Sequence, residues 1–270
     1  MASNWQERTA GPDAHDTRGK TAPQRLRRLD QFLMAMEPRL LAVPGSTVVD
    51  LGYGRAPITT IEWFERLRAV TPTVSMIGIE RDPERVAAAE LHSRPGLSFR
   101  RGDFQLPLNK GERVRLLRAL NVLRQYEESA AAPAHRQLIA QIDEGGLVVE
   151  GTCDPPGRTM VVAILRRRHG EVHSEGLLFA TSLTEHVDPR QFQAVLPKHL
   201  IHRMVPGEAI HDFFDAWDHA TKLTRDRSAF GVRQHFVAAA EALAQVTPGV
   251  NTRRSWLRNG WLFWSGAPYP

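Results

Sequence analysis

The 270-residue sequence has a single cysteine, Cys153, and contains no long apolar run. One cysteine excludes an intramolecular disulfide, and a cytoplasmic protein is the default for a chain that lacks one. No run approaches the ~18 apolar residues that a membrane-spanning helix needs. The N-terminal residues are charged and include no apolar stretch of the kind that secretory signals contain. We therefore expect a cytoplasmic protein that has no membrane contact.

Positive charge is only mildly in excess, with a net charge of +5. Hydrophobic residues make up 42% of the chain. That hydrophobic share is enough for a packed core. The positive excess favours an anionic partner such as RNA. The basic residues are scattered, however, apart from Arg166 to Arg168, and an ordinary basic composition that involves no nucleic acid is the stronger explanation. The composition therefore keeps RNA open as a partner without selecting it.

The chain begins with a polar stretch, residues 1–22, which has no hydrophobic period and which we predict to be a disordered lead-in. The remainder, residues 23–270, is expected to form a single domain. Within it, apolar residues at three- and four-residue steps predict an N-terminal helix over residues 23–43. The motifs described next divide the rest into two halves, residues 44–152 and residues 153–270.

A glycine-rich turn organises the first of these halves. A short β-branched run leads into Gly52 and Gly54, and a helix-like segment over residues 59–70 follows, so the pattern predicts strand, tight turn and helix. Glycine lets the backbone turn sharply and lets a ligand approach closely, and the helix N-terminus beyond offers N–H groups. This arrangement is typical of a nucleotide site at the end of the first strand. A dinucleotide site would have a third glycine where this chain has Pro57, which disfavours NAD.

Acidic residues lie at the ends of three successive predicted strands. Asp50 ends the first strand, Glu80 ends the second, and Asp103 follows the third. A carboxylate at the end of the second strand can accept both ribose hydroxyls of a nucleoside. Because right-handed crossovers bring the ends of parallel strands to one rim, we expect the three acids to lie along a single edge of the sheet. For Asp103 the competing interpretation is an Asx turn, which is common after any strand.

The run from Asp50 to Gly54, Asp-Leu-Gly-Tyr-Gly, resembles motif I of the class I S-adenosylmethionine (SAM) dependent methyltransferases. Glu80 matches the second motif of that family in type and position, and Gly-Asp-Phe at residues 102–104 looks like its adenine-binding motif. The resemblance covers about residues 44–152, which it makes the cofactor-binding half, and it leaves residues 153–270 as the substrate and C-terminal half. It implies an α/β fold: a seven-stranded, mostly parallel, Rossmann-like sheet flanked by helices, with an antiparallel edge and a helical C-terminal part.

The resemblance also implies roles for individual residues. The acid of motif I helps hold the methionine end of SAM, the glycines face the cofactor, Glu80 binds the ribose, and Asp103 binds the adenine amino group with Phe104 against the ring. The predicted cofactor-binding residues are Asp50, Leu51, Gly52, Tyr53, Gly54, Glu80, Arg81, Gly102, Asp103, Phe104 and Asn121.

The segment after the fourth predicted strand, residues 113–121, bears on the acceptor. Methyltransferases place substrate-facing residues here, and we expect Asn121, Arg124 and Tyr126 to line the pocket. The competing interpretation makes Arg124 a surface charge and Tyr126 a local packing residue. Several amine-methylating members carry [D/N]-P-P-[Y/F] at this point. This chain has Asn-Val-Leu-Arg-Gln-Tyr, which removes support for amine methylation and slightly favours O-methylation.

The resemblance thus implies a SAM-dependent methyltransferase acting on a small-molecule acceptor that the sequence does not name. No residue is identifiable as a catalytic base. Two alternatives remain open, namely an RNA methyltransferase and a methyltransferase-like protein that binds SAM without catalysis.

The C-terminal half carries fewer signals. A fifth strand is expected over residues 146–152, and strand-like runs over residues 159–165 and 176–183 predict an antiparallel pair joined by a polar connection. The aromatic end, residues 261–265, predicts a final strand or an apolar patch for a homodimer contact. Helices are expected over residues 189–196, 207–223 and 229–246. Histidines such as His199 and His202 lack a matching carboxylate–His motif or a cysteine pair, so we predict no metal site.

Overall fold

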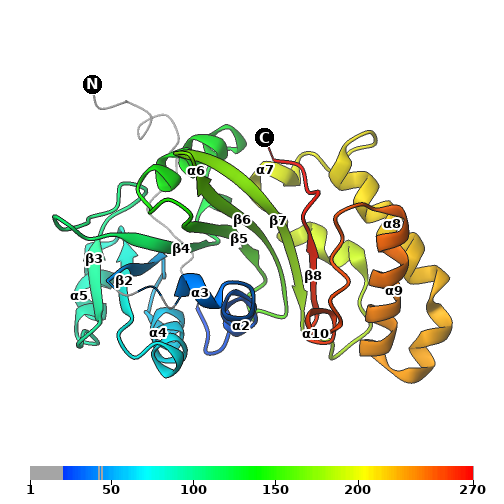
Figure 1. Cartoon of the computed structure of the whole chain (residues 1–270), viewed down its shortest axis with the longest axis horizontal. Helices are drawn as coiled ribbons and strands as arrows, with labels where there is room; N and C mark the ends of the chain where they lie inside the picture. The colour runs from blue at the N-terminus through cyan, green and yellow to red at the C-terminus, as the bar shows by residue number, and fades with distance from the viewer. Residues whose placement is uncertain (1–20, 42, 44, 270) are drawn as a thin grey trace. The chain divides into compact units, whose positions relative to one another are not determined.

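The computed structural model describes residues 21–41, 43 and 45–269, and these form an eight-stranded sheet with the order β3-β2-β1-β4-β5-β6-β7-β8 (Figure 1). β1 pairs in parallel with β2 and β4, β2 pairs in parallel with β3, and β7 pairs antiparallel with β8. The α/β class with an antiparallel edge is confirmed, and the sheet has eight strands where seven were predicted. The strands are β1 (Thr47–Leu51), β2 (Ser75–Glu80), β3 (Leu97–Arg101), β4 (Val114–Leu120), β5 (Leu147–Cys153), β6 (Thr159–Arg168), β7 (Glu171–Thr181) and β8 (Trp261–Trp264).

The helices mostly lie where the apolar periodicity predicts them. The α-helices are α2 (Arg27–Met36), α3 (Pro38–Leu41), α4 (Ile58–Val70), α5 (Pro83–Glu90), α6 (Ala131–Ala140), α7 (Lys198–Ile201), α8 (Ala209–Leu223), α9 (Val232–Val246) and α10 (Arg254–Leu257). The 3₁₀-helices are η1 (Leu123–Gln125), η2 (Glu128–Ala130), η3 (Pro189–Val195) and η4 (Arg225–Phe230).

Two predicted helices differ from the observed ones for local reasons. The N-terminal helix expected over residues 23–43 is divided into α2 and α3 at Glu37, since a residue that precedes proline is disfavoured in the helical region. The segment expected as a helix over residues 189–196 is the 3₁₀-helix η3, in which Asp188 caps the backbone N–H of Arg190. Residues 1–20 of the predicted lead-in lie outside the described residues.

The described chain forms two compact units, one made of residues up to 150 with residues 165–173, the other of residues 151–164 with residues 174–269. The expectation that residues 23–270 act as a single domain stays a prediction. All predicted cofactor-binding residues belong to the first unit.

The first unit is built on buried parallel strands. Every residue of β1 and of β4 is buried, as is usual for parallel strands whose two faces are covered. Three charged residues nevertheless lie in these strands, namely Asp50 in β1 and Arg115 and Arg118 in β4. Buried charges need partners, so these positions mark where the core departs from apolar packing.

The polar connection expected at residues 166–173 is instead mostly strand. β6 continues to Arg168 and β7 starts at Glu171, so only His169 and Gly170 form the turn, with φ of 53° and 82°. Two consecutive positive φ angles are the requirement of a tight I′ hairpin turn. Arg166 pairs with Glu37, and Arg167 donates from Nη1 to the carbonyl of Ile142 at 2.5 Å. Arg166 and Arg167 are therefore engaged by the protein itself.

The second unit has an aromatic core between β7, β8 and α8. The rings of Phe179 and Phe213 stack at 5.0 Å, and Phe213 stacks on Trp264 at 4.2 Å. Trp217 packs edge-on against Phe179 at 5.4 Å. Offset and edge-on aromatic pairs of this kind stabilise a core beyond their buried area. The aromatic C-terminal segment is therefore the last strand of the sheet, as one of its two interpretations predicted.

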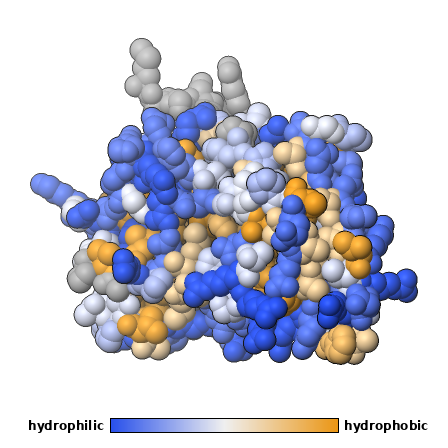
Figure 2. Space-filling model, turned by 45° about the vertical axis from the view of Figure 1, so that its right-hand side comes forward, coloured by the Kyte–Doolittle hydropathy of each residue, from blue (hydrophilic) through white to orange (hydrophobic). Residues whose placement is uncertain are grey.

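Among the residues that the structure describes, no helix is both long enough and apolar enough to cross a bilayer. The face shown in Figure 2 is mainly hydrophilic, and its hydrophobic residues lie in separate patches. A homodimer contact stays a prediction from the sequence.

Candidate ligand site at the ends of the parallel strands

The three strands that precede the predicted motifs end side by side. In the parallel register Leu51 of β1 lies opposite Ile79 of β2, and Glu80 lies opposite Arg101 of β3. The backbone N–H of Gly52 donates to the carbonyl of Ile79 at 2.7 Å. The turns that follow β1, β2 and β3 therefore begin at one edge of the sheet, as the sequence predicts.

The turn after β1 requires glycine. Gly52 and Gly54 have φ of 72° and 84°, in the left-handed region that side chains disfavour. A Cβ on Gly52 would lie 2.7 Å from Cγ2 of Val122, which follows β4. The turn and the segment after β4 thus pack against each other without room for a side chain. Helix α4 then begins at Ile58 and has no side-chain cap at Pro57.

Glu80 joins the end of β2 to this turn. Its Oε2 accepts the backbone N–H of Gly54 at 2.9 Å, and its Oε1 accepts those of Arg81 at 2.8 Å and Asp82 at 3.3 Å. Only 6% of the residue is exposed. Hydrogen bonds from backbone N–H groups stabilise an ionised carboxylate, and Oε2 keeps one lone pair for a further donor. The structure therefore holds a buried carboxylate directly beside the glycine turn.

An aromatic pair lies beside the third motif. Phe104 is buried, and its ring meets that of Tyr126 edge-on at 5.3 Å. Burial raises the pKa of Tyr126, Arg81 acts to lower it, and the carboxylates of Asp103 and Glu80 raise it further. Tyr126 therefore belongs to the surroundings of the predicted ribose and adenine residues, although its position in the sequence predicted an acceptor-side role.

Asp103 itself accepts the backbone N–H of Gln105 at 2.9 Å, which is the hydrogen bond of an Asx turn. Its Oδ1 is therefore part of the local turn geometry that the competing interpretation describes. A ligand role for Asp103 does not conflict with this bond, because a carboxylate has about four acceptor positions.

Three further predicted residues lie in the segments that follow β4 and β1, namely Asn121, Arg124 and Tyr53. Asn121 directly follows β4 with φ of 62°, an uncommon conformation for a residue other than glycine. Arg124 lies in η1 and is exposed. The side chain of Tyr53 packs edge-on to Phe99 of β3 at 5.5 Å, and its hydroxyl donates to the carbonyl of Arg85 in α5 at 3.4 Å.

The structure also reveals a buried ion network that the sequence did not predict. Arg118 donates from Nε to Oδ1 of Asp50 at 2.9 Å and from Nη2 to Oδ2 at 2.8 Å. The Thr60 hydroxyl donates to the same Oδ2 at 2.6 Å. Arg118 also contacts Asp30 of α2 and lies over the Trp63 ring, 4.2 Å from its centroid. Asp50 is thus fixed by a bidentate guanidinium and by a hydroxyl.

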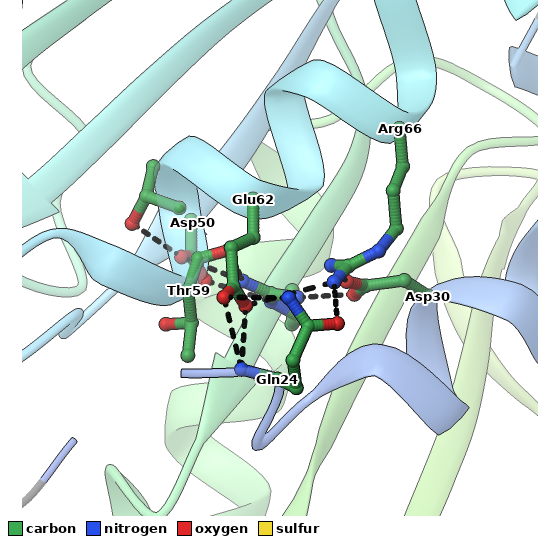
Figure 3. Close-up of polar contacts among 8 residues, drawn as sticks. Gln24, Asp30, Asp50, Thr59, Glu62 and Arg66 are labelled. Atoms are coloured by element: carbon green, nitrogen blue, oxygen red, sulfur yellow. Dashed lines mark hydrogen bonds and ion pairs between the residues drawn. The ribbon is translucent and has the colours of Figure 1, made fainter. Parts of the chain in front are cut away.

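The network continues to the start of the described chain (Figure 3). Arg66 of α4 donates from Nη1 to Oδ2 of Asp30 at 2.6 Å and from Nη2 to the side-chain oxygen of Gln24 at 2.7 Å. The backbone N–H of Gln24 donates to Glu62 at 2.9 Å. Arg66 also pairs with Glu62 at 3.6 Å, so the two guanidiniums of the network serve the carboxylates of Asp30, Asp50 and Glu62.

A signal for this network exists in the sequence. Asp50 and Arg118 are register partners on adjacent parallel strands, so their side chains point to the same face of the sheet. Two arginines within the otherwise apolar run of β4 indicate buried charges that need partners. The partner could not be identified before the strand register was known.

Asp30 gives the network a pH dependence. Burial raises the pKa of Asp30 from 3.8 to about 6, against the opposing effect of Arg118 and Arg66. The native state therefore holds this proton more tightly than the unfolded state, and the stability it contributes below pH ~4 is lost as the pH rises through 6. The difference between the free energies of unfolding of the wild type and of Asp30→Asn should fall by about 2 kcal/mol between pH 4 and pH 7 in urea titrations. A difference that is constant over this range would contradict the raised pKa.

Comparisons with known proteins give matches in solved structures only, since no family model and no curated protein matches the chain. A plantazolicin methyltransferase in complex with a desmethyl analogue and S-adenosylhomocysteine (SAH) is 14% identical, with 52% of this chain and 51% of that chain covered and a TM-score of 0.39. Magnesium protoporphyrin IX methyltransferase from Synechocystis PCC 6803 with bound SAH is 18% identical, with 48% and 55% covered and a TM-score of 0.36.

An O-methyltransferase family 2 protein from Planctomyces limnophilus DSM 3776 in complex with apigenin is 23% identical, with 48% of this chain and 41% of that chain covered and a TM-score of 0.37. The chain therefore spans about half the length of the solved proteins that it matches.

Proposed function

We propose that the protein is a SAM-dependent methyltransferase of the class I type, with its cofactor site at the carboxyl ends of β1, β2 and β3. The observation that carries the proposal is the junction between Glu80 and the glycine turn, in which a buried carboxylate accepts the N–H of Gly54 at 2.9 Å. A carboxylate at this point of a parallel sheet suits the two hydroxyls of a ribose, and a turn without side chains lets the nucleoside approach the backbone.

The other predicted residues fit an adenosyl group around this junction. Asp103 offers carboxylate oxygens to an adenine amino group, and the buried Phe104 with Tyr126 forms an apolar wall for the ring. Arg81, Gly102 and the backbone of the turn after Leu51 would complete the cradle. Asn121 and Arg124 follow β4 and remain the candidates for contact with the acceptor.

The chemistry makes modest demands on this chain's own residues. When bound, SAM supplies a methyl group that passes from its sulfonium to the nucleophile of the acceptor. The protein then contributes alignment and exclusion of water. An oxygen nucleophile would also need a base to take its proton. We assign no residue to that role, and the catalytic residues are left unassigned.

Calorimetry tests the site. We expect SAM and SAH to bind the wild type with micromolar dissociation constants, and Glu80→Gln to weaken both by about tenfold or more, since a hydrogen bond to a charged group is lost. The matched control is Glu90→Gln, an exposed residue at the end of α5, which should bind as the wild type does. Binding of NADH with no binding of SAH would refute the proposal.

A second candidate is a SAM-binding protein without catalysis. The segment after β4 favours it, because Asn-Val-Leu-Arg-Gln-Tyr lacks the amine-methylation signature [D/N]-P-P-[Y/F]. Transfer of a labelled methyl group from SAM to a component of a cell extract, lost in Glu80→Gln, would separate the enzyme from this candidate. An acceptor RNA has weaker support than a small molecule, since Arg166 and Arg167 are engaged within the protein. A cytoplasmic location stays a prediction.

A further inference from the structure

We propose that Asp50 does not hold the amino group of the cofactor, and that the site consequently recognises the adenosine half of its ligand. This inference rests on the proposed function and specifies what the site recognises. The ligand class becomes adenine nucleosides with a 5′-thioether or sulfonium, whether or not they carry an amino-acid tail. The guanidinium of Arg118 occupies the carboxylate that the resemblance assigns to the methionine end.

The first step in the argument is the occupancy of the Asp50 oxygens. Oδ1 accepts Nε of Arg118 at 2.9 Å, while Oδ2 accepts Nη2 of Arg118 at 2.8 Å and the Thr60 hydroxyl at 2.6 Å. Three of about four acceptor positions are therefore filled. The residue is 3% exposed, so a ligand ammonium would reach the remaining position on Oδ1 only if the packing around Asp50 moved.

The second step is that Arg118 is held independently of Asp50. Its side chain is fully buried, pairs with Asp30, donates to the carbonyl of Thr59 at 3.2 Å and lies over the Trp63 ring. Asp50 and Asp30 raise the pKa of Arg118 against the effect of its burial, so it stays charged. Loss of its bidentate partner would leave the buried guanidinium with Asp30 as its one remaining partner among the two acids, which costs more than one new hydrogen bond to an ammonium returns.

The third step is the contrast with Glu80. Asp50 is paired with Arg118, and Asp30 is paired with both Arg118 and Arg66, so each of these two buried carboxylates already has a guanidinium partner. The hydrogen bonds of Glu80 come from backbone N–H groups, which leave its negative charge in place. Of the two acids that end β1 and β2, Glu80 is therefore the one that offers its charge to a ligand, and its position suits ribose hydroxyls.

Calorimetry with SAH and with 5′-methylthioadenosine, which lacks the amino-acid tail, tests the inference on the full chain. We expect the two dissociation constants to differ by less than about tenfold, because no charge-assisted hydrogen bond to the ammonium is gained. SAH binding that is tighter by tenfold or more would overturn the inference while leaving the proposed function intact. Absence of binding by both ligands would overturn the proposed function, and the inference with it.

Two variants make the test specific to Asp50. Asp50→Asn should leave the ratio of the two dissociation constants unchanged, with folding checked by circular dichroism. Thr60→Val removes only the hydroxyl donor to Oδ2 and keeps the bidentate pair, so it remains informative if Asp50→Asn does not fold. A variant that weakens SAH binding by tenfold or more but leaves 5′-methylthioadenosine unaffected would show that Asp50 contacts the tail.

Discussion

Replacing Arg118 with methionine is expected to lower the free energy of unfolding by about 3–5 kcal/mol. Methionine fills much of the same volume, so the loss comes from the charges and not from a cavity. Without the guanidinium, the buried Asp50 keeps only the Thr60 hydroxyl, and Asp30 keeps Arg66. Urea denaturation followed by circular dichroism measures the effect.

The matched control is Arg113→Met, which makes the same substitution at the residue preceding β4. Arg113 pairs with Asp143, but its side chain is 70% exposed, so its removal should cost no more than about 1 kcal/mol. The double variant Asp50→Asn/Arg118→Met restores charge balance and should be more stable than Arg118→Met alone, since the two sites are coupled. Equal losses in Arg118→Met and Arg113→Met would show that the network does not stabilise the protein.

Replacing Gly52 with alanine should damage both stability and ligand binding. At φ of 72° a Cβ is strained, and here it would also lie 2.7 Å from Cγ2 of Val122. Strain and overpacking together should cost about 2–5 kcal/mol. Because the N–H of Gly54 anchors Glu80, a displaced turn should also weaken SAH binding. Urea denaturation and calorimetry measure the two effects.

The control variant Gly111→Ala separates the cost of backbone strain from the cost of the contact with Val122. Gly111 has a φ of 87°, and a Cβ there would meet nothing within 4 Å, so this variant should lose about 1–2 kcal/mol and bind SAH normally. In the double variant Gly52→Ala/Val122→Ala, the methyl group that blocks the new Cβ is gone, and part of the loss should be recovered. If Gly52→Ala and Gly111→Ala lost equal stability, the close approach of Val122 would have no energetic weight.

Much of the candidate site follows from local sequence. Buried parallel strands appear as short apolar runs, and the change to helical periodicity after Gly54 and after Glu80 marks where β1 and β2 end. The right-handed crossover between parallel strands then places the ends of consecutive strands on one rim, whatever the rest of the sequence is. The positions of Gly52, Glu80 and Asp103 at one edge of the sheet could therefore be predicted from the chain alone.

The partners of Asp50 were decided only by the tertiary structure. Asp50 and Arg118 are separated by 68 residues in the sequence, and Asp30 and Arg118 by 88. Hydrophobic periodicity within a segment does not specify a contact between residues so far apart in the chain. The strand register brings Asp50 and Arg118 to the same face, and the packing of α2 adds Asp30. The contact of Tyr126 with Phe104 and the extension of β6 and β7 into a polar stretch depend likewise on pairing between segments. Sequence patterns report how a residue's own segment folds, whereas the partner of a buried charge is fixed by which segments become neighbours.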